Sequence, residues 1–239
     1  MCGICGFTGE LLNRDRVLKD MADKIIHRGP DSCGYFSNQE ISMGFRRLSI
    51  IDLEAGDQPI KTLVLTFNGE IYNYKELREE LQRKGHIFAT HTDSEVLIHG
   101  FEEWREGLLN RLRGMFGFAI WNTVDKSLFI ARDFFGIKPM HYTKVGDHLV
   151  YGSEIKSILQ FPGFEKKFNY DTLNNYLSFQ YAVPPQTFFE NLYCLLPGHY
   201  LWYKNGKITT TRYWEAMFEP QNDMTEAQAV DKIEKVFAD

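Results

Sequence analysis

Short runs of apolar, β-branched and aromatic residues alternate along the chain with polar, turn-forming residues, a pattern that predicts many short strands. The predicted strands are Gly3 to Thr8, Ile41 to Ile51, Leu63 to Phe67, Phe116 to Trp121, Ser127 to Arg132, Met140 to Lys144 and His148 to Tyr151. A hairpin is predicted from His199 to Tyr213, because Asn205-Gly206 accepts the positive φ angles of a type I′ turn.

Helical periodicity interrupts the strands in a few longer segments. The predicted helices are Asp15 to Ile26, Asn73 to Lys84, Asp93 to Trp104, Glu154 to Gln160 and Tyr170 to Ser178. One begins with a capping box of Asn73 and Glu76, and another with Thr92 and Glu95. Strands joined by hairpins, with helices in long excursions, favour stacked antiparallel sheets covered by helices.

The C-terminal segment from Thr225 to Asp239 predicts an amphipathic helix, with a cap at Thr225 and Val230, Ile233 and Phe237 on one face. It stops without a clear end signal. We therefore predict one domain over residues 2–214, followed over 215–239 by a linker and the first helix of a second domain.

Composition narrows the class of protein. The 239 residues are 44% hydrophobic and 15% aromatic, enough for a full core, and the net charge of −5 offers no basic field for nucleic acid. No apolar run approaches the roughly 18 to 20 residues that cross a membrane, and the N-terminus has no secretory leader. We expect a cytoplasmic protein with neither a nucleic-acid nor a membrane partner.

The four cysteines, at positions 2, 5, 33 and 194, are expected to be free thiols in a reducing compartment. Cys2 and Cys5 have C-x-x-C spacing, but a zinc site would need a second pair, and neither another cysteine pair nor a histidine pair at ligand spacing accompanies them. We therefore expect no metal site.

Cys2 is the first candidate for chemistry. Removal of Met1 would leave the Cys2 thiol beside its own α-amine, whose ordinary pKa of about 7.7 to 8.0 lets it act as a base near neutral pH. One residue would then supply both nucleophile and base. On this motif alone, an ordinary N-terminal cysteine is the competing interpretation.

Several further motifs follow Cys2 in a fixed order. They are Arg28-Gly-Pro-Asp31, Arg47-Leu-Ser-Ile-Ile-Asp52, Asn68-Gly-Glu-Ile-Tyr-Asn73, Asp93-Ser-Glu95, Gly114 to Ile120, Arg132-Asp133, Gly136-Ile-Lys-Pro139, Ser153-Glu-Ile-Lys156 and Pro197-Gly-His-Tyr200. With Met1 to Phe7, the series resembles the N-terminal class II glutamine amidotransferase domain of asparagine synthetases over most of the chain. The resemblance implies an N-terminal nucleophile hydrolase fold, a four-layer α/β/β/α sandwich of two mostly antiparallel sheets.

The resemblance also implies roles for individual residues. Asn68 and Gly69 would form the oxyanion hole, although Asn-Gly between apolar strands is also a strong hairpin signal. Arg47 would hold the α-carboxylate of glutamine with two parallel hydrogen bonds, while Arg46 should point to the opposite face of its strand.

Glu70 and Asp93 would receive the substrate's α-ammonium group, although an acid in the first turn of a helix is also favourable to the helix dipole. Leu48, Ile50 and Ile51 match positions that line the glutamine pocket, or they are simply core residues. Arg28 and Asp31 would fix the loop near the nucleophile, or form a buried ion pair in a turn.

The mechanism that the resemblance implies is attack of the Cys2 thiolate on the glutamine amide, giving glutamate and ammonia without a cofactor. The expected partners are glutamine, a synthetase domain in cis that would use ATP and Mg²⁺ to amidate aspartate, and a second copy in a possible homodimer. Because this chain contains no Ser-Gly-Gly-x-Asp-Ser phosphate loop, it should lack synthetase activity by itself.

Three other interpretations stay open on the sequence. One is a class II amidotransferase with a different acceptor, such as an enzyme that forms glucosamine-6-phosphate or phosphoribosylamine. Another is a non-catalytic domain of the same fold, and the third is an N-terminal nucleophile amidohydrolase that acts on other amides.

Overall fold

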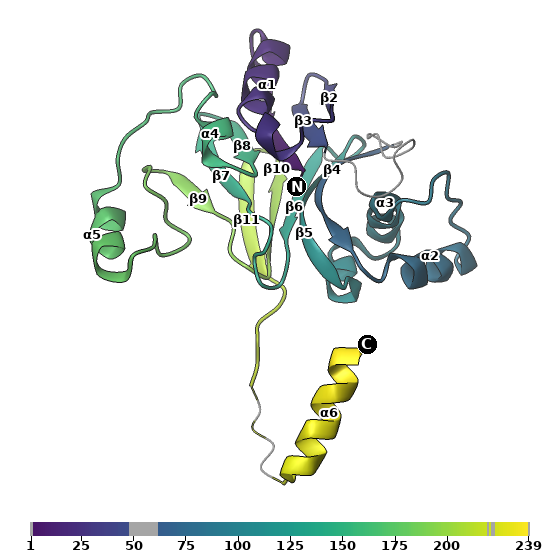
Figure 1. Cartoon of the computed structure of the whole chain (residues 1–239). Helices are drawn as coiled ribbons and strands as arrows, with labels where there is room; N and C mark the ends of the chain where they lie inside the picture. The colour runs from purple at the N-terminus through teal and green to yellow at the C-terminus, as the bar shows by residue number, and fades with distance from the viewer. Residues whose placement is uncertain (1, 48–61, 219, 221–222, 239) are drawn as a thin grey trace.

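Two antiparallel β-sheets face each other in the computed structural model, which describes residues 2–47, 62–218, 220 and 223–238 (Figure 1). In these residues one sheet has the order β2-β3-β1-β8-β7-β9 and the other β11-β10-β6-β5-β4. The strands of the first sheet are β1 (Gly3–Thr8), β2 (Ser32–Ser37), β3 (Ile41–Arg47), β7 (His141–Val145), β8 (His148–Gly152) and β9 (Leu192–Cys194). Those of the second are β4 (Leu63–Ile71), β5 (Gly114–Asn122), β6 (Ser127–Arg132), β10 (His199–Lys204) and β11 (Lys207–Arg212).

The described part of the chain also contains α-helices, some of which cover the outer faces of the two sheets. They are α1 (Arg14–Asp23), α2 (Tyr74–Arg83), α3 (Asp93–Trp104), α4 (Ile155–Ile158), α5 (Tyr170–Phe179) and α6 (Glu226–Ala238), with short 3₁₀ turns η1 (Ile26–Arg28) and η2 (Arg105–Arg111). Figure 1 shows α1 and α4 beside the first sheet and α2 and α3 beside the second. These layers confirm the predicted four-layer α/β/β/α sandwich.

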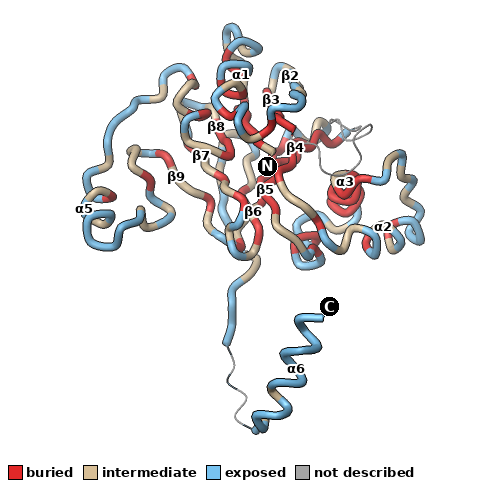
Figure 2. The backbone as a smooth tube through the Cα atoms, viewed as in Figure 1, coloured by how far each residue is buried: buried red, intermediate tan, exposed pale blue. Residues whose placement is uncertain are grey.

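Three groups of buried residues occupy the three spaces between the layers. Because strand side chains alternate, Phe7 of β1 packs with α1 in one group, while Ile4 faces the other sheet. The middle group, between the sheets, also contains Trp121 and Tyr151. The third group joins Phe67 of β4 to α2 and α3. Figure 2 shows the buried residues concentrated in the strands and in α3.

The hairpin prediction is confirmed, since Asn205 and Gly206 have φ angles of 50° and 75° between β10 and β11. The strand predicted from Ile41 to Ile51 is described as far as Arg47; its remainder lies outside the described residues. The sequence did not predict β2 and β9. β2 is largely exposed, and β9 has only 3 residues, so neither has a clear apolar alternation.

Both capping boxes are wrong, although α2 and α3 begin close to the predicted positions. The Asn73 side chain instead bridges to the backbone of Arg111 and Arg113, at 2.9 and 2.8 Å. Glu95 accepts hydrogen bonds from the backbone N–H groups of Ala89 and Thr90, each at 2.7 Å. Asn73 therefore binds the backbone of a distant segment, and Glu95 binds the loop just before its helix, instead of forming the predicted capping boxes.

The cap predicted at Thr225 is confirmed. The Thr225 N–H donates to Gln228 Oε1 at 2.9 Å, and the Gln228 N–H donates to Thr225 Oγ1 at 3.3 Å. The helix that follows, α6, has no buried residue in its described part, and Figure 1 draws it apart from the sheets. Among the helices described, none has the length and apolar character that a membrane span requires. The domain boundary near residue 214 stays a prediction.

Candidate active site

Cys2 lies immediately before β1, a central strand of the first sheet. Its side chain packs against the residues between the two sheets, on the same strand face as Ile4. β1 and β4 contact each other across this interior space. Cys2 therefore faces the second sheet and is only partly exposed.

Cys5 occupies the opposite face of β1. It is fully buried with Phe7 in the layer under α1, and burial raises the pKa of its thiol to about 12. Because Cys2 and Cys5 point to opposite sides of the sheet, their C-x-x-C spacing does not create a chelating pair. Cys5 is a structural thiol, and Cys2 is the one oriented toward the interior of the sandwich.

Arg28 fixes the backbone at Cys2. Its Nε donates to the Cys2 carbonyl at 3.0 Å, and its Nη1 lies 3.0 Å from Glu154 Oε1. The ion pair proposed for Arg28 is therefore made with Glu154, while the Asp31 N–H donates to the Arg47 carbonyl at 3.2 Å. The expectation that Arg28 holds the nucleophile's loop is supported.

The Glu154 carboxylate contacts three nitrogen-bearing side chains beside this bond. His27 Nε2 lies 2.8 Å from Oε1 and Lys156 Nζ lies 2.9 Å from Oε2, in addition to Arg28. Burial would raise the pKa of Glu154, but the hydrogen bonds from Lys156, Arg28 and His27 outweigh it and lower the pKa to about 2. The carboxylate therefore stays charged and keeps Arg28 in place.

Asn68 and Gly69 lie inside β4 rather than in a turn. The strand pairs with β5 without interruption from Leu63 to Ile71, so the hairpin interpretation of Asn-Gly is wrong. Val64 belongs to the inter-sheet group and Phe67 to the helix-side group, which places Asn68 on the inter-sheet face toward β1. The sequence analysis ended this strand at Phe67, because polar residues follow it. In the structure these polar residues continue the strand and face the space between the sheets instead of water.

The Asn68 side chain is almost fully buried, and its Nδ2 has no hydrogen-bond partner among the described residues. Leaving a buried donor unsatisfied costs about 1 to 3 kcal/mol, so such groups are rare unless they serve a ligand. At Gly69, a Cβ would lie 2.1 Å from the Met115 carbonyl oxygen. Close contact between β4 and β5 therefore requires glycine at this position.

Arg47, at the end of β3, is buried. Met43 and Phe45 of the same strand face the space between the sheets, and alternation gives Arg47 the same face. Arg46 points the other way, as predicted: its Nε donates to the Ala22 carbonyl at 3.3 Å, and its guanidinium pairs with Asp23 of α1. Leu48, Ile50 and Ile51, the predicted pocket-lining residues, lie outside the described residues.

Glu70 and Asp93 come together although they belong to different elements. Glu70 follows Asn68 on the same face of β4, and Asp93 begins α3 and accepts the Ile71 N–H on Oδ2 at 3.1 Å. Burial raises the pKa of Asp93, and the neighbouring charge of Glu70 raises it further. A cation bound between them would relieve this repulsion, which suits a substrate ammonium group.

Lys138 is a site residue to which the sequence analysis gave no role. It is buried, and burial lowers its pKa together with the charge of Arg28, while Asp133, Cys2 and Glu70 act in the opposite direction. The Lys138 ammonium group is therefore near enough to Cys2, Glu70 and Arg28 for their charges to act on its pKa. The signal was present in Gly136-Ile-Lys-Pro139, where a lysine stands in an otherwise apolar motif.

A loop built on Asp133 presents this lysine. The Asp133 carboxylate accepts the backbone N–H groups of Phe116, Ile137 and Lys138, at 3.2, 2.8 and 2.9 Å. Since Phe116 belongs to β5, the loop is anchored directly to the second sheet. Lys138 therefore reaches the site from a rigid support.

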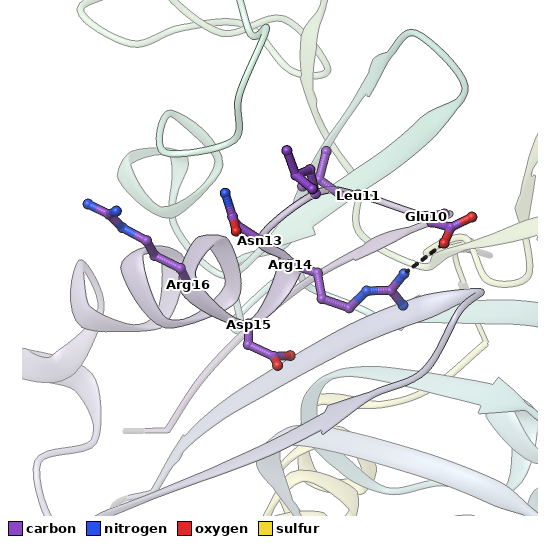
Figure 3. Close-up of a pocket in the computed structure, with 7 residues that line it drawn as sticks. Glu10, Leu11, Asn13, Arg14, Asp15 and Arg16 are labelled. Atoms are coloured by element: carbon purple, nitrogen blue, oxygen red, sulfur yellow. Dashed lines mark ion pairs between the residues drawn. The ribbon is translucent and has the colours of Figure 1, made fainter.

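Figure 3 shows a different pocket, at the start of α1, that contains none of the predicted site residues. It is lined by residues 10–16, and its Glu10 and Arg14 side chains form an ion pair at 3.9 Å. Most of these residues are exposed to solvent. The predicted site residues that the structure describes lie elsewhere, around Cys2 and on the inter-sheet faces of β3 and β4.

The glutamine amidotransferase domain family matches residues 1–214. The chain therefore belongs to this family, and it is a class II glutamine amidotransferase domain. It is 41% identical over 230 residues to asparagine synthetase [glutamine-hydrolyzing] 1 of Bacillus subtilis (strain 168), covering 91% of this chain and 36% of that protein. A putative asparagine synthetase [glutamine-hydrolyzing] of Mycobacterium bovis (strain ATCC BAA-935 / AF2122/97) is 37% identical over 269 residues. This similarity covers 100% of this chain and 41% of that protein.

Solved structures agree on the fold. The glutamine phosphoribosylpyrophosphate amidotransferase of B. subtilis, complexed with ADP and GMP, superposes with a TM-score of 0.64 at 18% identity, over 90% of this chain and 50% of that chain. The structure of the allosteric regulatory enzyme of purine biosynthesis superposes with a TM-score of 0.66 at 19% identity, also over 90% of this chain and 50% of that chain. The chain spans well under half the length of the synthetases that it matches.

Proposed function

We propose that this chain hydrolyses the side-chain amide of glutamine with the Cys2 thiolate as nucleophile. The observation that carries the proposal is the buried Asn68 Nδ2, a donor without a described partner, on the strand face directed toward β1 and Cys2. A pre-oriented donor of this kind stabilises the negative oxygen that forms when a thiolate attacks an amide carbon.

In the proposed reaction, the Cys2 α-amine takes the proton of the thiol, and the thiolate sulfur bonds to the amide carbon. The oxyanion rests on Asn68 Nδ2 and the Gly69 N–H. The carbon–nitrogen bond then breaks, and ammonia leaves with the proton held by the amine. Water hydrolyses the thioester to glutamate and restores the thiol.

The substrate's two charged groups have candidate receptors on different elements, β3 for one and β4 with α3 for the other. Arg47 would hold the α-carboxylate, and Glu70 with Asp93 would hold the α-ammonium group. The buried Asp93 carboxylate, whose pKa is raised by burial and by Glu70, supports this assignment because a bound cation would offset both effects. No metal or organic cofactor takes part in this half-reaction.

Covalent labelling tests the nucleophile directly. The chain would be incubated with 6-diazo-5-oxo-norleucine, a glutamine analogue, and its intact mass measured with Cys2→Ala and Cys33→Ala variants alongside. We expect Met1 to be absent and one adduct to form on the parent chain and on Cys33→Ala, whose cysteine is exposed, but not on Cys2→Ala. A processed chain that takes no adduct would favour the non-catalytic domain.

We further propose that residues 215–239 are a linker and the first helix of an ATP- and Mg²⁺-dependent synthetase domain in cis, which amidates aspartate to asparagine. The similarity to synthetases of greater length and the exposed apolar side chains of α6, Val230, Ile233 and Phe237, support this arrangement. A cytoplasmic location and a homodimer belong to the same proposal.

Limited proteolysis and product analysis test the cis arrangement. Cleavage between residues 214 and 226 that leaves a stable glutaminase would support it, whereas a C-terminus protected against the sandwich would contradict it. A longer protein containing this chain should form asparagine and AMP from aspartate, ATP and glutamine, and this chain alone should form neither. Glutamine-dependent amidation of another acceptor would replace the asparagine assignment while leaving the glutaminase intact.

A further inference from the structure

Two histidines and a glutamate converge at the junction of α2 and α3, outside the glutamine site. His86 follows α2, while His99 and Glu102 belong to α3. His86 Nδ1 lies 3.2 Å from His99 Nδ1, and Glu102 Oε2 lies 3.1 Å from the latter and 3.7 Å from the former. Three potential metal-ligating atoms therefore form one compact triangle.

The size of the triangle fits one face of a tetrahedral metal site. Zn²⁺ binds histidine nitrogen at about 2.0–2.1 Å and carboxylate oxygen at about 2.0–2.2 Å, which separates neighbouring tetrahedral ligands by roughly 3.3–3.5 Å. The three observed separations bracket this range. An ion on the axis of the triangle would reach all three atoms with small side-chain adjustments.

The outer nitrogens of both imidazoles face carboxylates. His86 Nε2 lies 3.4 Å from Glu103 Oε2, and His99 Nε2 lies 3.6 Å from Glu95 Oε1. At His86 this is the carboxylate–histidine–metal arrangement, in which the outer N–H points to a carboxylate and the other nitrogen presents its lone pair to the ion. The separation at His99 is longer than a hydrogen bond, so Glu95 acts on that imidazole through its charge alone. With protons on both Nε2 atoms, the two Nδ1 atoms and the Glu102 oxygen are all acceptors directed at one point.

Both outer carboxylates are themselves held in place. Glu95 is fixed by the backbone N–H groups of Ala89 and Thr90, and Glu103 by Lys84 Nζ at 2.7 Å. The Phe88 ring packs on His99 at 4.5 Å between centroids and limits its rotation. The ligand geometry is therefore set by contacts that exist without an ion.

The cluster is accessible and distinct from the glutamine site. His99 is buried, but the side chains of His86 and Glu102 are 16% and 33% exposed, so an ion can enter from solvent. Asp93 and His99 share α3, and at about 1.5 Å of rise per residue they are roughly 9 Å apart along its axis.

We propose that His86, His99 and Glu102 bind one divalent transition-metal ion, Zn²⁺ being the best match to two imidazoles and one carboxylate, with solvent as the fourth ligand. Bound there, the ion ties the segment after α2 to the middle of α3. Since Asp93 lies at the start of the same helix, occupancy would also stiffen the support of the proposed glutamine site.

Metal titration tests the proposal without depending on activity. Zn²⁺ would be titrated calorimetrically into the Cys2→Ala chain, a background that removes the N-terminal thiol as a competing ligand. We expect one ion per chain, with affinity at least tenfold weaker in His86→Asn and in Glu102→Gln, two partly exposed positions. His91→Asn, which alters an exposed histidine of the same segment, should bind like the parent.

Two further measurements make the result decisive. Glu103→Gln, which changes only an outer carboxylate, should weaken binding by roughly 10- to 100-fold. The Co²⁺ form should show tetrahedral d–d bands without thiolate charge-transfer absorption. Failure of the parent to bind Zn²⁺, equal affinity in His86→Asn and Glu102→Gln, or a thiolate spectrum that reports binding at Cys33 or Cys194 would each overturn the proposal.

Discussion

Arg28 Nε donates a hydrogen bond of 3.0 Å to the backbone carbonyl of Cys2, and the same guanidinium is held by Glu154 at 3.0 Å. A second link fixes the adjoining strand, because the Ile4 N–H donates to Ser153 Oγ at 3.0 Å. The start of the chain is thereby clamped by η1 and by the segment after β8, two elements remote in sequence. An N-terminal nucleophile requires such a clamp, since a chain terminus is otherwise poorly ordered.

Replacing Arg28 should therefore slow the reaction without removing the nucleophile. We expect Arg28→Lys to lower the kcat for glutamine hydrolysis roughly 10- to 100-fold with little change in KM. A lysine ammonium group cannot reproduce the planar geometry with which the guanidinium donates to the Cys2 carbonyl and to Glu154 together. Steady-state ammonia release would measure this. Arg46→Lys, on the opposite face, should lower stability more than kcat; equal kcat losses in both variants would argue against a specific clamp.

Asn68→Ala should separate catalysis from stability. If its Nδ2 serves the oxyanion, kcat should fall by about 10²- to 10³-fold, corresponding to about 2.7 to 4 kcal/mol. Because that donor has no described partner, its loss breaks no hydrogen bond in the described structure, and the urea midpoint should change little. Asn122→Ala, at the far end of the same strand pair, is the control; unfolding of Asn68→Ala with kcat retained would assign Asn68 a structural role.

Asp93→Asn tests the ammonium receptor. The amide keeps an oxygen that can accept the Ile71 N–H but removes the charge, so we expect the KM for glutamine to rise roughly 10- to 100-fold through loss of a charged hydrogen bond of about 1.5 to 3 kcal/mol. In the parent, the raised pKa of Asp93 means that substrate binding improves as pH rises through that pKa. Glu95→Gln removes another acid of the same helical turn and should cost stability only. If both variants behave alike, the helix-dipole interpretation of Asp93 is correct.

Gly69→Ala should prevent normal pairing of β4 with β5. Its Cβ would lie 2.1 Å from a backbone oxygen and 2.8 Å from the Phe116 Cα, neither of which can rotate away, so we expect a loss of more than about 3 kcal/mol. Gly117→Ala, opposite Asn68, would place its Cβ no closer than 3.5 Å to any atom and should change stability by about 1 kcal/mol or less. Denaturant unfolding of both variants would measure the difference.

His141 should make the fold sensitive to acid. Burial lowers its pKa to about 4, although its Nδ1 lies 3.2 Å from the Ser153 carbonyl. Because the unfolded chain takes up this proton near pH 6.5, the contribution of neutral His141 is present above that pH and is lost as pH falls toward 4, by about 3 kcal/mol at most. As pH falls from 7 to 4, the free energy of unfolding should decrease less steeply in His141→Asn than in the parent. In His91→Asn, which changes an exposed histidine, it should decrease as steeply as in the parent.

Local patterning determined a large part of this protein. Alternation along β1 and β3 fixed which side chains face the second sheet, including the opposite directions of Arg46 and Arg47. The Asn205-Gly206 turn fixed a hairpin, because its two positive φ angles are a local property. The order of short motifs after Cys2 identified the amidotransferase domain, since each motif is readable from neighbouring residues alone.

The tertiary structure decided what depends on distant partners. Glu154, which is distant in sequence, pairs with Arg28, where the sequence suggested Asp31. Asn68 continues a strand instead of forming a turn, because β4 pairs with the distant strand β5. The motif from Gly136 to Pro139 contains Lys138, but neither the burial of this lysine nor the His86–His99 pair could be predicted from the pattern, for the same reason. Packing of sheets and helices sets the burial of Lys138 and the spacing of the two imidazoles, and no local sequence rule contains either quantity.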